Sequence, residues 1–207
     1  MKLYYAPAAC SLAPHIVARE AGLDLALEKV DLVAKKTASG RDYLSINPKG
    51  AVPALELDTG DVLTENAIVL QYLADKAPQS GLMVANGMAR WHFLELVNFI
   101  ATELRKGFGP LWHHPSAGVR EATIEYLSKR FDILDRQLRD QPYLTGETFT
   151  IADAYAYAIL NWTKIHKIDM HRWPRLMAFL DRVAARPAVL RALAEEGLTQ
   201  VRPAQSA

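Results

Sequence analysis

Hydrophobic positions in the first third of the chain follow two different periods. Short alternating or β-prone runs predict strands, whereas apolar residues spaced three and four apart predict helices. The strand patterns fall at residues 2–5, 25–32, 52–57 and 62–64. The helical patterns fall at residues 11–20, 41–46 and 67–74. A βαβ unit followed by a ββα unit predicts an α/β fold, a mixed four-stranded sheet with helices packed on it.

Farther along the chain, only helical patterns remain. Residues 79–88 contain serine and two glycines after a proline, which predicts a linker. Amphipathic helical spacing then recurs at residues 89–107, 117–139, 151–165, 174–185 and 188–196. We therefore expect two domains, an α/β domain at residues 1–78 and an all-α domain at residues 89–207.

The start of one of these helices is unusually well specified. Thr150 stands at the expected N-cap and Asp153 follows three residues later, so each side chain can satisfy an otherwise unpaired backbone N–H group. The helix that follows is nearly apolar on all sides, which indicates a buried helix. We interpret this start as the folding centre of the all-α domain and not as a catalytic site.

Composition excludes several classes of function. The 207 residues carry a formal net charge of +1, so no strong field draws the chain to nucleic acid or to an acidic membrane surface. No apolar stretch approaches the roughly 20 residues of a membrane span. A single cysteine forms no intrachain disulfide, and Pro7 interrupts the place where a signal peptide needs an apolar run. The expected location is the cytoplasm.

Metal chemistry has little support in the sequence. The six histidines stand in no HExxH arrangement, and there is no second cysteine to complete a CxxC pair. Lone histidines on helices are more often packing or surface residues. We therefore expect no metal site.

The only cysteine, Cys10, lies between the first strand and the first helix. A thiol at a helix N-terminus faces unpaired N–H groups and the positive end of the helix dipole, which stabilise a thiolate. We therefore expect a lowered pKa for Cys10, with the Ser11 hydroxyl as a nearby donor. The alternative is that Cys10 is a small buried hydrophobe, and its position alone does not decide between the two.

Two further features favour a functional role for this thiol. Pro53 follows Val52 at the start of a strand, and a cis bond between them would turn the Val52 backbone outward to pair with an extended peptide. Glu65 and Asn66 open the helix after the hairpin, where backbone N–H groups bind a carboxylate and Glu65 favours an ammonium group. Plain capping of that helix is the alternative. Together the three places describe a thiol, a peptide-pairing strand and an amino-acid head site, which is the outline of glutathione.

Three segments carry a family resemblance in order and spacing. They are YYAPAACSLAPHIVAREAGL, INPKGAVPALEL and LTENAIVLQYLAD, and the helix start FTIADAYAYAILNW agrees with them. The chain resembles beta-class bacterial glutathione transferases over almost its whole length. The resemblance implies a thioredoxin-like N-terminal domain, an all-helical C-terminal domain and a homodimer. It also implies that Cys10 lies beside the sulfur of glutathione, the co-substrate, and forms a mixed disulfide with it.

The resemblance also assigns residues to two binding sites. The glutathione contacts that it implies are Ser11, Lys35, Val52, Pro53, Glu65, Asn66, Asn98, Thr102, Glu103 and Lys106. Among these, Lys35 is expected to meet the glycine carboxylate. The pocket that it implies for a hydrophobic electrophile is lined by Tyr5, Ala9, Phe108, Leu111, Trp112, Tyr155 and Trp162. Aromatic residues at helical spacing are also typical of a core, so this second set is the weaker one.

Two positions depart from the family pattern. Arg105 stands where many relatives carry a histidine beside the catalytic thiol, and Ala8 stands where glycine is frequent. An arginine stabilises a thiolate but does not act as a base near neutral pH. We therefore expect Cys10, Ser11 and Arg105 to be the catalytic residues, without a titrating histidine.

Two linked activities follow as a hypothesis. Glutathione thiolate attacks an electrophilic carbon in a hydrophobic pocket, and Cys10 exchanges with glutathione disulfides. The alternatives are a non-catalytic glutathione- or ligand-binding protein and a specialised glutathione-dependent lyase or dehalogenase on the same fold.

Overall fold

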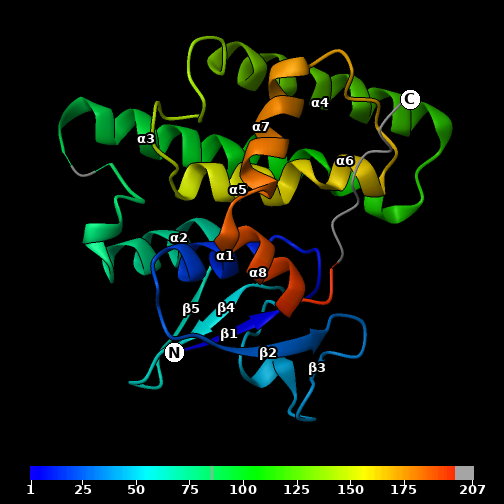
Figure 1. The fold of residues 1–207 in the computed structure, drawn as a ribbon. Helices are drawn as coiled ribbons and strands as arrows, with labels where there is room; N and C mark the ends of the chain where they lie inside the picture. The colour runs from blue at the N-terminus through cyan, green and yellow to red at the C-terminus, as the bar shows by residue number, and fades with distance from the viewer. Residues whose placement is uncertain (85, 199–207) are drawn as a thin grey trace.

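The computed structural model describes residues 1–84 and 86–198, and Figure 1 shows a sheet covered on one side by helices. The strands are β1 (Lys2–Tyr5), β2 (Ala26–Asp31), β3 (Lys36–Thr37), β4 (Ala54–Glu56) and β5 (Val62–Thr64). The α-helices are α1 (Leu12–Glu20), α2 (Asn66–Asp75), α3 (Gly87–Phe99), α4 (Ala117–Gln137), α5 (Ile151–Leu160), α6 (Trp162–Ile165), α7 (Pro174–Ala184) and α8 (Pro187–Glu195). Short 3₁₀ turns lie at Tyr43–Ser45, Pro78–Ser80 and Gly109–His113.

The sheet has five strands in the order β3-β2-β1-β4-β5. β1 pairs with β2 in parallel and with β4 antiparallel, and β4 and β5 form the predicted antiparallel hairpin. The prediction of four strands is wrong by one, because β3 adds two residues that pair antiparallel with the end of β2. A strand this short has too few positions to show alternation in the sequence. The helix predicted at residues 41–46 is only the 3₁₀ turn Tyr43–Ser45.

The C-terminal helices follow the predicted segments with two interruptions. The helix predicted at residues 89–107 is α-helical to Phe99 and then continues as a π-helix at Ile100–Arg105. The helix predicted at residues 151–165 divides at Asn161 into α5 and α6. A π-helix turns more widely than an α-helix and frequently lies at a functional site. Here its last residue is Arg105.

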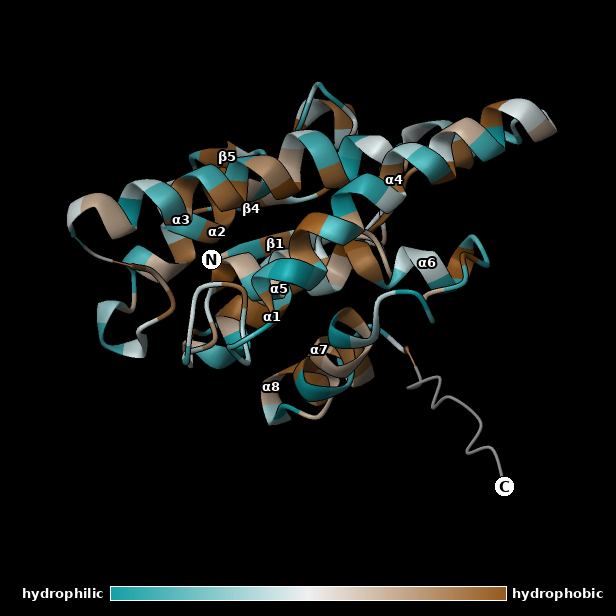
Figure 2. Ribbon diagram, turned by 90° about the horizontal axis from the view of Figure 1, so that it is seen from above, coloured by the Kyte–Doolittle hydropathy of each residue, from teal (hydrophilic) through white to brown (hydrophobic). Residues whose placement is uncertain are grey.

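Hydrophobic side chains form a core on each face of the sheet. On the helical face, α1 and α2 lie between the sheet and the C-terminal helices, and the buried side chains of both parts belong to one continuous cluster (Figure 1). On the other face a smaller cluster joins Tyr4, Tyr43, Val30, Val52 and Ala54. Figure 2 shows α4 banded in teal and brown, as expected for a helix with one buried face.

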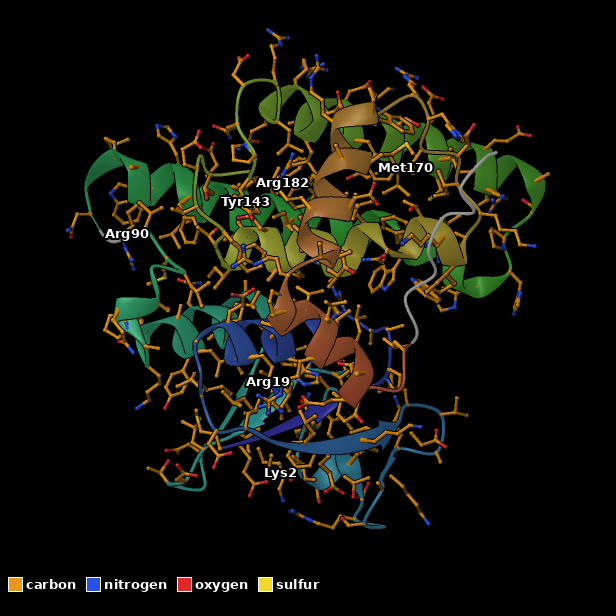
Figure 3. The ribbon with its side chains drawn as sticks, viewed as in Figure 1. Lys2, Arg19, Arg90, Tyr143, Met170 and Arg182 are labelled. Atoms are coloured by element: carbon orange, nitrogen blue, oxygen red, sulfur yellow. The ribbon has the colours of Figure 1, made fainter. Side chains whose placement is uncertain are left out.

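The last helix returns to the first one. His15 is a buried residue of α1, and both of its ring nitrogens contact carboxylates at the end of α8. Nε2 lies 2.7 Å from Glu195 Oε2, and Nδ1 lies 3.0 Å from Glu196 Oε1. Arg19 lies beside α8 in Figure 3 and donates to the same Glu195 at 2.7 Å. These hydrogen bonds join α1, near the start of the chain, to the end of α8. None of the described helices is long and apolar enough to cross a membrane.

Candidate active site

A cavity of about 260 Å³ opens beside Cys10, and we refer to it as the thiol cavity. The loop before α1, the loop that leads into β4, the start of α2, the π-helix and α5 all contribute to its wall. It is lined by Cys10, Asn47, Lys49, Ala51, Val52, Pro53, Thr64, Glu65, Asn66, Ala67, Asn98, Ala101, Thr102, Arg105, Lys106 and Tyr155. Segments that are far apart in the sequence therefore meet around one thiol.

The Cys10 thiol is almost completely buried and donates to the carbonyl oxygen of Val52 at 3.3 Å. Burial raises the pKa of Cys10, and the adjacent Arg105 guanidinium acts in the opposite direction. The lowered pKa expected from the sequence is therefore wrong in direction. The physical reason is burial: a backbone hydrogen bond at Cys10 does lower the pKa, as expected at a helix start, but the loss of hydration has the larger effect.

Arg105 brings a permanent positive charge to this buried thiol. It ends the π-helix and lines the thiol cavity together with Lys106. Its guanidinium carries five N–H donors and no acceptor, so it attracts a thiolate but takes no proton from a thiol. The site therefore stabilises an anion by charge and hydrogen bonding, and Arg105 contributes no base.

The loop before β4 contributes Ala51, Val52 and Pro53 to the wall of the cavity. The Val52–Pro53 peptide bond is cis, and the preceding Ala51 carbonyl accepts hydrogen bonds from Tyr43 Oη at 2.8 Å and from Asn47 Nδ2 at 2.7 Å. These two side chains hold the loop in place, so that Val52 lies against Cys10.

Glu65 and Asn66 lie where the sequence placed them, at the start of α2. Glu65 has a left-handed backbone (φ 67°), and its carboxylate accepts from Lys49 Nζ at 2.6 Å, a hydrogen bond that lowers its pKa. Buried Asn66 donates from Nδ2 to the Cys10 carbonyl at 3.0 Å. Its Oδ1 atom is buried without a hydrogen-bond partner among the described residues. The amide thus links α2 directly to the thiol loop.

Three of the residues assigned to glutathione do not line the thiol cavity. The buried Ser11 hydroxyl accepts from Ala6 N and donates to Ala6 O, both at 3.2 Å. Lys35 donates to the Gly50 carbonyl at 2.8 Å. Glu103 accepts from Tyr126 Oη at 2.7 Å and from Arg130 at 2.6 Å. These side chains brace the loops and helices around the site, while Asn98, Thr102 and Lys106 reach the cavity itself.

Three of the residues expected around an electrophile, Phe108, Trp112 and Trp162, pack together. The ring of His166 joins them, and we refer to these four residues as the aromatic cluster. Trp162 lies edge-on to both Phe108 and Trp112, at 5.6 and 5.3 Å between ring centroids. Its indole donates to the Ala8 carbonyl at 2.9 Å. The aromatic cluster therefore contacts the loop that carries Cys10.

The other four residues expected around an electrophile lie outside the aromatic cluster. Leu111 is buried, Ala9 is half-buried, and the Tyr5 ring lies 6.3 Å from that of His15. Tyr155, in contrast, lines the polar thiol cavity.

Sequence reasoning missed several residues of the cavity wall. Asn47, Lys49, Ala51, Thr64, Ala67 and Ala101 line the cavity although the sequence did not single them out. The pair between Lys49 and Glu65 joins positions sixteen residues apart, and only the fold brings them together. The one available hint was the run Asn47-Pro48-Lys49-Gly50, a composition typical of a loop, directly before Val52 and Pro53.

Comparison with known proteins gives consistent results. Residues 9–76 match the N-terminal domain of glutathione S-transferases, and residues 99–187 match their C-terminal domain. The chain is 44% identical over 200 residues to glutathione S-transferase GstA of Escherichia coli O157:H7, covering 96% of this chain and all of that protein.

Two solved structures are similar over nearly the whole chain. A glutathione transferase from Methylococcus capsulatus has a TM-score of 0.93 and 51% identity, covering 96% of this chain and 99% of the other. A sphingomonad glutathione S-transferase complexed with glutathione has a TM-score of 0.91 and 43% identity, covering 96% of this chain and 100% of the other. These similarities confirm the expected thioredoxin-like N-terminal domain and helical C-terminal domain.

Proposed function

This chain belongs to the glutathione S-transferase family, and we propose that its thiol cavity binds glutathione with the sulfur beside Cys10 and Arg105. The observation that carries the proposal is the arrangement of a thiol, a guanidinium, a peptide backbone and a helix N-terminus around one cavity. The start of α2 suits the α-carboxylate of the γ-glutamyl group, and the Glu65 carboxylate suits its ammonium group.

For the transferase reaction, we propose that Arg105 holds the sulfur of glutathione as a thiolate. The thiol proton leaves to water, because a guanidinium does not accept it. The sulfur lone pair then forms a bond to an electrophilic carbon, and the leaving group departs with its electron pair. The aromatic cluster next to the Ala8 carbonyl supports a hydrophobic, aromatic class of electrophile.

We propose thiol–disulfide exchange as a second activity of the same site. The Cys10 thiolate attacks the glutathione sulfur of a mixed disulfide, forms a Cys10–glutathione disulfide and releases the other thiolate. A second glutathione thiolate then attacks this bond, which yields oxidised glutathione and restores Cys10. Since Cys10 is the only cysteine, a second glutathione takes the place of a resolving cysteine.

The variant Cys10→Ala separates the two activities. We expect it to keep binding to immobilised glutathione and to keep conjugating an aryl halide within about tenfold of the wild type, while exchange with a glutathione mixed disulfide is lost. Reductase activity equal to that of the wild type would exclude the exchange mechanism. If the wild-type protein itself is not retained on immobilised glutathione, the whole functional proposal fails.

We further propose the assembly and location of the enzyme. We propose residues 1–78 and 89–207 as its two domains, with residues 79–88 as the linker; separate family matches at residues 9–76 and 99–187 support a division into two. Exposed apolar side chains on α2 and at the start of α3, Ile68, Met88 and Trp91, support a homodimer. Sedimentation is then expected to give twice the chain mass of 23.0 kDa. The single cysteine supports a cytoplasmic location and a role in detoxification of electrophiles there.

A further inference from the structure

Tyr155 occupies an unexpected place in the site. Its sequence position suggested the hydrophobic pocket, yet its side chain lines the thiol cavity with Cys10, Asn66 and Arg105. It comes from α5, the fully buried helix whose residues are otherwise alanine, isoleucine, leucine, aspartate and a second tyrosine. Only 1% of Tyr155 is exposed, so the residue belongs to the interior of the protein and not to its outer surface.

The groups that act on the pKa of Tyr155 include Cys10 and Arg105, the two proposed catalytic residues. Burial raises the pKa of Tyr155, and the Cys10 sulfur raises it further, while Arg105 and the Asn66 amide act in the opposite direction. The phenol therefore keeps its proton at neutral pH and is a hydrogen-bond donor there. In the same cavity, Asn66 Oδ1 is a buried acceptor without a partner among the described residues. Tyr155 and Asn66 thus bring a donor and an acceptor into the wall of the cavity that contains the thiol.

A sulfur anion in this cavity would meet two different donors. Arg105 supplies a charge, and the Tyr155 hydroxyl is a neutral donor on a different helix. Arg105 is anchored at the end of a π-helix and Tyr155 in the middle of α5, so the two approach the cavity from separate elements. Donors that are already oriented toward a developing anion stabilise it without the cost of reorganisation.

We propose that Tyr155 is a catalytic residue, whose hydroxyl donates a hydrogen bond to the glutathione sulfur and stabilises its thiolate together with Arg105. The inference rests on the proposed binding of glutathione in the thiol cavity. Tyr155 keeps its proton throughout. The glutathione thiol loses its proton to water, and the sulfur then uses its lone pair to form the bond to carbon.

The competing explanation is that Tyr155 only fills space between α5 and the start of α2. That explanation predicts a change in stability when the ring is altered, and no change in the ionisation of the bound thiol. Tyr157 provides a matched control because it lies on the same helix, is 3% exposed and does not line the thiol cavity. Its pKa is raised by burial, and the neighbouring polar groups are Asn161 and Asp181 instead of Cys10.

The test compares Tyr155→Phe with Tyr157→Phe, both of which keep the aromatic ring. Glutathione affinity is measured by calorimetry, and the ionisation of bound glutathione is followed by thiolate ultraviolet absorbance and by the pH profile of kcat/KM with an aryl halide. We expect Tyr155→Phe to raise the pKa of the bound thiol by about one pH unit, and kcat/KM below that pKa to fall about tenfold. We expect Tyr157→Phe to retain the wild-type profile.

The possible outcomes are distinct. An unchanged profile in Tyr155→Phe, or the same change of profile in both variants, overturns the role of Tyr155 while the proposed function stands. A raised thiol pKa in Tyr155→Phe alone, with glutathione affinity within about threefold of the wild type, supports it. If calorimetry detects no glutathione binding to the wild-type protein, the proposed function itself fails. Urea unfolding of both variants shows whether a change in kcat/KM comes from a loss of folded protein.

Discussion

At the residue scale, two opposing effects act on the Cys10 thiol. Burial favours the neutral thiol because a charged group loses its hydration, and the Arg105 guanidinium favours the thiolate. The direction of the net effect is a raised pKa. Cys10 is therefore mostly protonated near neutral pH, and its reactivity depends strongly on the positive charge of Arg105 beside it.

This dependence gives a prediction for Arg105→Gln. Since Arg105 lowers the pKa of Cys10, its removal is expected to raise that pKa, so that less thiolate is present at pH 7 and alkylation by iodoacetamide slows about tenfold. The measurement is the alkylation rate as a function of pH. Lys106→Gln is the matched control, because Lys106 lines the same cavity and is not among the groups that act most on the Cys10 pKa. Equal slowing in both variants would mean that Arg105 acts only through overall charge.

The sequence predicted some of these residues well and others poorly, for a physical reason. Cys10, Val52 and Glu65 all line the cavity, because each lies at the junction of a loop with a strand or helix, where the fold fixes its direction. Lys35 does not, since a long flexible side chain is placed by its hydrogen-bond partner, here the Gly50 carbonyl. Such partners are set by tertiary contacts that spacing along the chain does not encode.

At the element scale, α5 depends on its first turn. The Asp153 carboxylate accepts from Thr150 N at 2.8 Å, from Thr150 Oγ1 at 2.9 Å and from Leu144 N at 2.8 Å. The predicted capping box is confirmed, and it also ties the preceding loop to the helix. Because α5 carries Tyr155, the cap that anchors the helix also positions a wall of the thiol cavity.

Removal of this cap is expected to destabilise the whole protein. The variant Thr150→Ala loses the hydroxyl that bonds Asp153 and is expected to lower the free energy of unfolding by about 1–2 kcal/mol. The measurement is the urea unfolding midpoint. The control is Thr148→Ala, because Thr148 is exposed two residues earlier, and its effect is expected to stay within about 0.5 kcal/mol. An unchanged midpoint for Thr150→Ala would contradict the importance of the cap.

Element types were more predictable than their fine geometry. The hydrophobic spacing predicted α1, the β4–β5 hairpin and the helical second half, because these segments present one apolar side over several turns or alternations. The π-helix at Ile100–Arg105 was not predicted, since six residues do not distinguish its wider turn from an α-helix. Yet the π-helix ends at Arg105, whose positive charge acts on Cys10. The geometry that the sequence did not predict is therefore part of the active site.

At the scale of the whole molecule, α8 fastens the C-terminal half to the loop that carries the thiol. Fully buried His15 lies between Glu195 and Glu196, and Glu196 also accepts from Ala8 N at 3.2 Å. Ala8 has a left-handed backbone (φ 59°), and its carbonyl accepts from Trp162. Both backbone groups of Ala8 are thus held by C-terminal side chains. The position of Cys10, two residues later, depends on how the two halves pack.

This connection predicts how stability responds to acid. Although burial opposes it, hydrogen bonds from Arg191, His15 and Arg19 lower the pKa of Glu195 from 4.5 to about 2. A carboxyl group with a lower pKa in the folded state stabilises the fold above the unfolded value of 4.5, and the stabilisation disappears as the pH falls toward 2. Because Glu195 is 28% exposed and partly screened, we expect this contribution to be about 1–3 kcal/mol.

The variant Glu195→Gln tests this contribution directly. It lacks the titrating carboxylate, so at neutral pH it is expected to be less stable than the wild type by about 1–3 kcal/mol. Its free energy of unfolding is also expected to fall less steeply between pH 4.5 and 2, so that the two curves converge in acid. Urea unfolding at a series of pH values measures both, with Glu147→Gln as a control at an exposed glutamate. Parallel curves would show that the Glu195 pairs add nothing to the folded state. Convergence would show that charge as well as packing holds α8 against α1.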